Sequence, residues 1–238
     1  MGSILSGEHT FKQFDTELEA VRSRVLQMGG LVETQIVRAV QALTEGNMPL
    51  SDQVIADDTR VNGMEVSIDE LCAHILARRQ PAASDLRMVI TVLKTITDLE
   101  RIGDEAEKIA RMSKLIHQSD RLVKPRFSEI KHVGDLALGM LRKSLDSFAR
   151  LDINAAAAVV RQDQHLDEEF RAILRQLITF MMEDPRTISG SLEILFVAKA
   201  IERIGDHAKN MSEYVVYLVK GKDVRHVTLE EFEREARE

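Results

Sequence analysis

The 238-residue chain has no tryptophan, four prolines and one cysteine, and aromatic residues make up only 4% of it. So few prolines favour long helices joined by a small number of turns. The low aromatic content argues against a β-sandwich or barrel, because strands favour aromatic and β-branched residues. The single cysteine, Cys72, cannot form an internal disulfide, so we interpret it as a buried apolar residue in a reducing compartment.

Long apolar runs and an excess of positive charge are also missing. No segment approaches the roughly 18 apolar residues of a membrane span, and the first ten residues lack the pattern of a signal peptide. The net charge of −7 argues against nucleic-acid binding, which usually needs a basic face, but it fits cation binding. We therefore expect a soluble, cytoplasmic protein that neither inserts into a membrane nor binds nucleic acid.

One pentapeptide occurs twice in the chain. Glu-Arg-Ile-Gly-Asp stands at 100–104 and again at 202–206, and an alanine follows at the same offset in both copies, as Ala106 and Ala208. Each copy lies inside a long segment of helical apolar periodicity. The repeat indicates an internal duplication.

The spacing within the pentapeptide has a chemical meaning. Its two acids are four positions apart, on one face of a helix, where like charges cost a few tenths of a kcal/mol. These acids are Glu100, Asp104, Glu202 and Asp206. A salt-bridge network or a bound cation would offset that cost. A mid-helix glycine costs roughly 0.5–1 kcal/mol relative to alanine, so Gly103 and Gly205 indicate close approach of a facing helix or a ligand.

Apolar residues recur at intervals of three and four over six segments, and no strand signal of useful length is present. The expected helices span about 11–45, 52–79, 86–117, 127–150, 155–182 and 192–220. We predict an all-α fold of two tandem, internally duplicated three-helix bundles, at residues 11–117 and 127–220, which should superpose. A polar linker at 118–126 separates the bundles, and the charged tail, 221–238, is either a short helix or disordered.

The duplication extends to the middle helix of each bundle. Asp58 and Asn62 lie about 20 residues before Pro81, as far as the first pentapeptide lies after it, and Asp163 and Asp167 precede Pro185 in the same way. In antiparallel neighbours these positions face each other, so each bundle gathers four oxygen-bearing side chains. The first cluster is Asp58, Asn62, Glu100 and Asp104. The second cluster is Asp163, Asp167, Glu202 and Asp206.

Clusters of oxygen ligands select hard cations such as Mg²⁺, Mn²⁺, Ca²⁺ or ferric iron. We expect the second cluster, with four carboxylates, to bind a cation more tightly than the first, in which Asn62 replaces one of them. The Glu-x-x-His pattern of di-iron proteins is absent, and His165 and His207 read as surface or network side chains. The alternative is a solvated or salt-bridged acidic face, with Arg101 and Arg203 neutralising their neighbours.

The segment Ala-Arg-Arg-Gln-Pro-Ala-Ala-Ser-Asp-Leu-Arg at 77–87, together with the two pentapeptides, resembles the PhoU family, and the resemblance extends over about 15–220. It implies two tandem three-helix bundles in a cytoplasmic homodimer. It also implies a negative regulator of the phosphate-starvation response that links a phosphate ABC transporter, through its ATPase subunit, to a sensor histidine kinase at the inner membrane. The resemblance further implies metal ions of Fe, Mn, Mg, Zn or Ca on the two acidic clusters, which are multinuclear in some members of the family.

Two other functions stay open at this stage. A metal-dependent hydrolase acting on phosphate compounds needs a positioned general base and an open metal position. The sequence offers no His or Lys beside the acids at the same spacing in both halves, so we expect no enzyme and no catalytic residues. The remaining alternative is a metal-free structural bundle whose acids are solvated.

Overall fold

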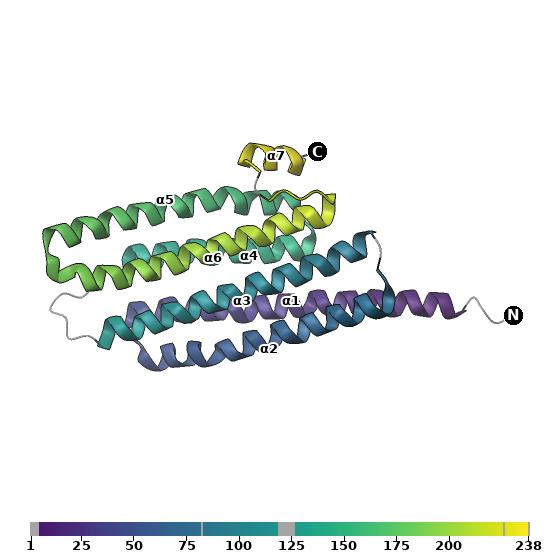
Figure 1. Cartoon of the computed structure of the whole chain (residues 1–238), viewed down its shortest axis with the longest axis horizontal. Helices are drawn as coiled ribbons and strands as arrows, with labels where there is room; N and C mark the ends of the chain where they lie inside the picture. Colours follow the sequence, from purple (N-terminus) through teal and green to yellow (C-terminus); the bar gives the residue numbers. More distant parts are fainter. Residues whose placement is uncertain (1–4, 82, 119–126, 226, 238) are drawn as a thin grey trace.

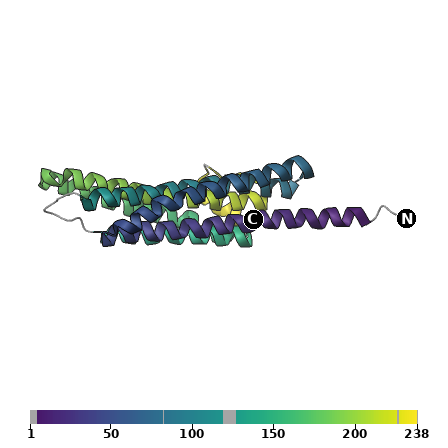
Figure 2. The same cartoon turned by 90° about the horizontal axis from the view of Figure 1, so that it is seen from below.

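The computed structural model describes residues 5–81, 83–118, 127–225 and 227–237, and in these ranges the chain forms helices and turns without a strand. The long helices lie side by side along the length of the molecule, and the N-terminal part of α1 projects beyond the others (Figures 1 and 2). The elements are α1 (Leu5–Glu45), α2 (Met48–Arg79), α3 (Ala83–Gln118), α4 (Ser128–Arg150), α5 (Ile153–Glu183), the 3₁₀ helix η1 (Pro185–Thr187), α6 (Ile188–Lys220) and α7 (Leu229–Arg237).

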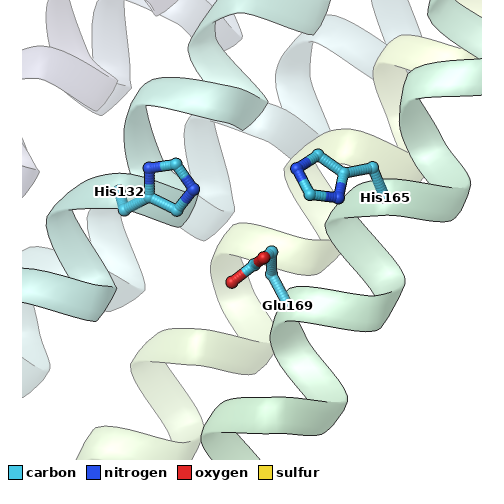
Figure 3. A group of neighbouring side chains, drawn as sticks. All are labelled: His132, His165 and Glu169. Atoms are coloured by element: carbon cyan, nitrogen blue, oxygen red, sulfur yellow. The ribbon is translucent and has the colours of Figure 1, made fainter.

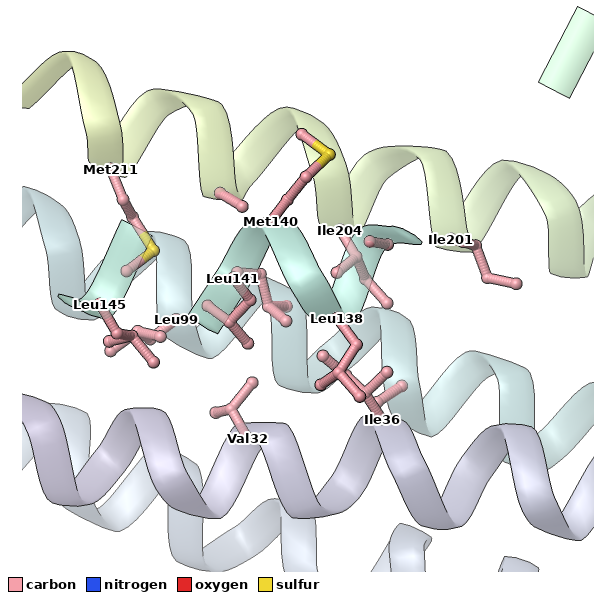
Figure 4. Close-up of a cluster of buried hydrophobic side chains, with 14 of the residues drawn as sticks. Val32, Ile36, Leu99, Leu138, Met140, Leu141, Leu145, Ile201, Ile204 and Met211 are labelled. Carbon is pink, nitrogen blue, oxygen red and sulfur yellow. The ribbon is translucent and has the colours of Figure 1, made fainter. Parts of the chain in front are cut away.

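The six long helices form two sets of three. Within each set, α1–α3 and α4–α6, every helix packs against the other two. The sets join mainly through α3 against α6, the most extensive helix contact in the molecule, and also through α1 against α4. Buried side chains of all four of these helices meet between the sets, in one continuous apolar core (Figure 4). The all-α prediction with six long helices is therefore confirmed, but the two bundles share their core.

The helix ends explain where the predicted boundaries differ. α2 begins at Met48, four residues before the expected start, because Asn47 caps it by accepting a hydrogen bond from the backbone N–H of Leu50. Pro49 suits the first turn of a helix, where no N–H partner is needed. α6 likewise begins earlier, directly after η1, and ends at Gly221, whose φ of 72° is the left-handed conformation that favours glycine at a C-cap.

Two regions complete the chain. The predicted linker at 118–126 lies almost wholly outside the described residues. The tail at 221–238 contains α7, which packs on α5 and buries Phe232 (Figure 1). Of the two alternatives for this tail, a short helix or disorder, the short helix is therefore the one observed. Within the described residues, none of the helices combines the length and the apolar character that crossing a membrane requires.

Candidate functional site

The first cluster lies between α2 and α3, next to α1. Asp58 is 8% exposed, and its Oδ2 accepts a hydrogen bond of 3.1 Å from Asn62 Nδ2, whereas its Oδ1 has no hydrogen-bond partner. Gln35 of α1 is 1% exposed, and neither polar atom of its amide has a partner. A buried polar group without a partner costs about 1–3 kcal/mol. The two oxygens among these atoms, Asp58 Oδ1 and Gln35 Oε1, are therefore open to a bound cation.

Gly103 allows this arrangement. A Cβ added there would lie 3.2 Å from Gln35 Oε1 and 3.4 Å from Asp58 Oδ1, closer than most Cβ contacts. The missing side chain thus leaves room for the two polar groups beside the α3 backbone. The sequence analysis gave two explanations for Gly103, close approach of a facing helix or of a ligand. The surroundings of Gly103 fit both.

The acids of the first cluster perturb one another. Burial, followed by the charges of Asp104 and Glu107, raises the pKa of Asp58 above its usual value. Burial and the charge of Asp104 do the same to the pKa of Glu100, with Glu65 and Asp58 adding to the effect. The pKa of Asp104 is raised by burial and by Glu107. The structure therefore brings together the three carboxylates predicted here, and it adds two more that the sequence analysis missed.

Little positive charge is paired with this group. Among the described residues, none of Asp58, Glu100 and Asp104 forms an ion pair within 4.0 Å. Arg111, about two turns beyond Asp104 on α3, pairs with Glu107 instead. The negative charge of the first cluster is therefore largely uncompensated, which favours a cation.

The second cluster, between α5 and α6, has four carboxylates in a different setting. Burial, followed by Glu202 and Asp163, raises the pKa of Asp206 to about 6. The other three acids are each ion-paired. These pairs are Lys209 Nζ–Asp163 Oδ2 at 2.8 Å, Lys199 Nζ–Glu202 Oε2 at 2.6 Å and Arg171–Asp167 at 3.6 Å. The expectation of a tighter second site assumed uncompensated charge, and that assumption does not hold.

Gly205 has a different role from Gly103. A Cβ at this position would overlap Leu166 Cδ2 and lie 3.5 Å from Met140 Cε. The neighbours are apolar, and Leu166 and Met140 are both buried. Here the glycine permits close helix packing, and no buried polar atom points at it.

Residues within and beside the pentapeptides also help to join the two sets, which the sequence analysis did not foresee. His207 Nδ1 lies 2.7 Å from Asp98 Oδ1, and both side chains are buried, so the prediction of His207 as a network side chain is confirmed. Arg203 pairs with Glu105 at 2.9 Å, although Glu105 is only 3% exposed. Arg101, its counterpart in the first copy, is exposed. A residue-by-residue comparison of the repeats would have marked these positions as unequal.

The sequence of the chain also matches a known protein family. The model of the PhoU domain matches the chain twice, over residues 25–113 and 130–215. The chain belongs to the PhoU family. A phosphate-specific transport system accessory protein PhoU homolog of Pseudomonas putida is 51% identical over 222 residues, which cover 93% of this chain and 86% of the relative.

Two solved PhoU structures share the fold. The crystal structure of PhoU from Pseudomonas aeruginosa superposes with a TM-score of 0.84 at 48% identity, covering 88% of this chain and 100% of that one. The crystal structure of the phosphate transport system regulatory protein PhoU from Streptococcus pneumoniae gives a TM-score of 0.81 at 29% identity, over 89% and 99%. The predicted membership of the PhoU family is thus confirmed.

Proposed function

We propose that this chain is a regulatory adaptor of phosphate homeostasis. It acts as a negative regulator of the phosphate-starvation (Pho) regulon and modulates phosphate ABC transport through contacts with other proteins. Its partners are the sensor histidine kinase of the phosphate response and the ATPase subunit of the transporter. Membership of the PhoU family carries this proposal, because relatives over nearly the whole chain are named as accessory or regulatory proteins of phosphate transport.

The proposal includes cation binding at the acidic clusters. Asp58, Glu100 and Asp104 would hold a hard divalent or ferric ion in the first cluster, and the Gln35 amide oxygen is a further neutral ligand of suitable chemistry. The unpartnered atoms of Gln35 and Asp58 support this assignment. A bound ion would neutralise carboxylates that now raise one another's pKa, and it would tie α1, α2 and α3 together at one level.

A phosphate hydrolase is the second candidate, and the second cluster argues against it. Lys209, which pairs with Asp163, is a candidate for the general base. Burial lowers its pKa, but the hydrogen bond and charge of Asp163 outweigh burial, and the net pKa is raised. A lysine held protonated in this way cannot accept a proton at neutral pH. We therefore expect the pure protein to release no phosphate from phosphate esters above background, with or without Mn²⁺.

The regulatory proposal is tested in cells. Deleting the gene should leave a reporter of phosphate-starvation genes active in excess phosphate, and restoring the wild-type chain should silence it. A reporter that stays silent in the deletion strain would refute the proposal. Phosphate release by the pure protein would instead favour the hydrolase.

The remaining proposals concern assembly. We propose a homodimer in the cytoplasm that reaches the inner membrane only through its partners. Sedimentation of the pure protein should give twice the chain mass. Fractionation should move the protein from the membrane to the soluble fraction when the transporter is deleted, and persistent membrane association would refute recruitment by this partner.

Elemental analysis tests the metal proposal directly. Protein purified without chelator should carry Fe, Mn or another hard cation, and Asp58→Ala combined with Glu100→Ala should lower the content. Asp69→Ala, at an exposed acid on α2, is the control. Equal metal content in all three proteins would exclude the first cluster as a site.

A further inference from the structure

A third group of potential metal ligands lies apart from both acidic clusters. His132 of α4 meets His165 and Glu169 of α5, and one ligand atom of each lies within 4.8 Å of the others (Figure 3). Both histidines are exposed and Glu169 is half-buried. Nitrogen ligands distinguish this group from the two clusters of oxygen ligands.

The position of the group follows from helix geometry. A helix turns by about 100° per residue, so His165 and Glu169 share one face of α5, about 200° around the helix from Asp163. The Asp163 side faces α6, where Lys209 binds it, and the other side faces α4. One helix thus presents oxygen ligands to one neighbour and a histidine–carboxylate pair to the other.

Among the described residues, none of His132, His165 and Glu169 takes part in a hydrogen bond or an ion pair with another side chain. By contrast, Asp163 of the same helix and Glu202 of α6 each have a cationic partner. The three side chains are therefore available as ligands without breaking an existing contact.

We propose that His132, His165 and Glu169 form a binding site for a borderline divalent transition-metal ion of the Zn²⁺ class. Two imidazoles and one carboxylate are a known ligand set for zinc with a fourth position open to water, and imidazole also suits Co²⁺ and Ni²⁺. Ligand atoms around a tetrahedral zinc lie about 3.4 Å apart, given bonds of about 2.0–2.1 Å. Rotation of the exposed histidines closes the remaining gap, which is at most about 1.4 Å.

The site bridges α4 and α5 and does not depend on the proposed function. An ion that binds only the folded chain stabilises it by mass action. We therefore expect Zn²⁺ to raise the melting temperature of the full chain in a concentration-dependent way. Because the ligands come from two helices, removal of either histidine should abolish that rise.

The test is a titration of the untagged full chain with Co²⁺, whose visible absorption reports histidine coordination at low coordination number. The wild type should bind one Co²⁺ with this signature, and Zn²⁺ should displace it. His132→Ala and His165→Ala should each weaken binding by about 100-fold or more, since loss of even an indirect partner of a metal ligand costs about 10–100-fold. Glu169→Gln should weaken it by about tenfold.

Two controls separate this site from others. His74→Ala removes an exposed histidine on α2, and Asp206→Asn alters the second cluster. Both variants should keep the absorption signature of Co²⁺ bound by histidine. If an alanine variant melts at a lower temperature than the wild type in EDTA, His132→Gln and His165→Gln replace the alanine variants in the titration. Wild-type absorption without the histidine signature would overturn the proposal. So would histidine variants that bind like the wild type, or an equal loss in His74→Ala.

Discussion

The two acidic clusters carry the same pentapeptide, yet their surroundings have opposite character. Next to Gly103 stands the buried amide of Gln35, whereas next to Gly205 stands the thioether of Met140. The acids of the first cluster lack ion pairs among the described residues, and three of the four acids of the second have cationic partners. The comparison shows that the number of carboxylates does not measure the demand for a cation. The charges that compensate them decide it.

The source of the difference is visible when the two pentapeptides are aligned. Directly after the pentapeptide, Glu105 of the first repeat corresponds to His207 of the second. Two residues further on, Glu107 corresponds to Lys209. Glu107 adds negative charge to the first cluster, while Lys209 removes it from the second. The duplicated helices have thus diverged in charge around a retained motif.

The largest expected effect on stability concerns the contact between the two sets of helices. Asp98 has no acidic counterpart in the second repeat, where Ala200 stands, and it pairs with the buried His207. Asp98→Ala leaves this histidine without its buried hydrogen-bond partner, so it should lower the free energy of unfolding by about 3 kcal/mol. Urea denaturation measures this. Asp69→Ala, at an exposed acid, should change it by less than about 0.5 kcal/mol. A similar small loss in both variants would show that the pair contributes nothing to this contact.

The second prediction uses a position where the repeats differ in sign, Glu213 in α6 against Arg111 in α3. Burial raises the pKa of Glu213 to about 7, opposed by Lys209 and Arg225 and aided by Asp163 and Asp223. The folded chain therefore holds this proton more tightly than the unfolded chain. The resulting stability is complete below pH 4.5 and is lost as the pH rises through about 7.

A neutral side chain should remove this pH dependence. Glu213→Gln should stabilise the fold by about 2–3 kcal/mol more at pH 8.5 than at pH 5, from the difference between the two pKa values. Urea denaturation at both pH values measures it. Asp135→Asn, at an exposed acid of α4, should show no such difference. A Glu213→Gln variant with the wild-type pH profile would mean that this carboxylate ionises freely in the folded chain.

Much of this architecture could be predicted from the sequence. The apolar periodicity predicted six helices, because each helix buries one row of apolar side chains. The two pentapeptides marked α3 and α6, the helices that pack against each other between the two sets. The ion pairs Lys199–Glu202 and Arg171–Asp167 follow from helical spacing and could have been predicted. The pair between Lys209 and Asp163 could not, because it joins two helices and depends on how they pack. The same holds for Gln35, which comes from α1, a helix without any part of the repeated motif. His132 escaped notice because its partners lie on another helix.

The glycines provide the third prediction. Alanine gains about 0.5–1 kcal/mol over glycine inside a helix, but overpacking a core costs about 1–3 kcal/mol. At Gly205 the added methyl group overlaps the buried Leu166, so Gly205→Ala should destabilise the chain by about 1–2 kcal/mol. At Gly103 the contacts are 3.2 Å or longer, so Gly103→Ala should be nearly neutral in stability. Thermal denaturation of both variants, without added metal, ranks them, and the reverse order would contradict the roles assigned to the two glycines.

The smallest expected effect tests whether the charge of Lys209 compensates the carboxylates of the second cluster. If Lys209 is what satisfies the second cluster, Lys209→Met should tighten Mn²⁺ binding there by about five- to tenfold, because Asp163 loses its ion pair and regains an unshared negative charge. The measurement is calorimetric titration in a background that carries Asp58→Ala and Glu100→Ala, so that only the second cluster binds. Lys114→Met is the matched control, since Lys114 also joins two helices through an ion pair, with Asp52, far along α3. Tighter binding in Lys209→Met alone would establish that compensating charge, and not the number of carboxylates, sets the order of the two sites. Unchanged binding would restore the order expected from four carboxylates against three.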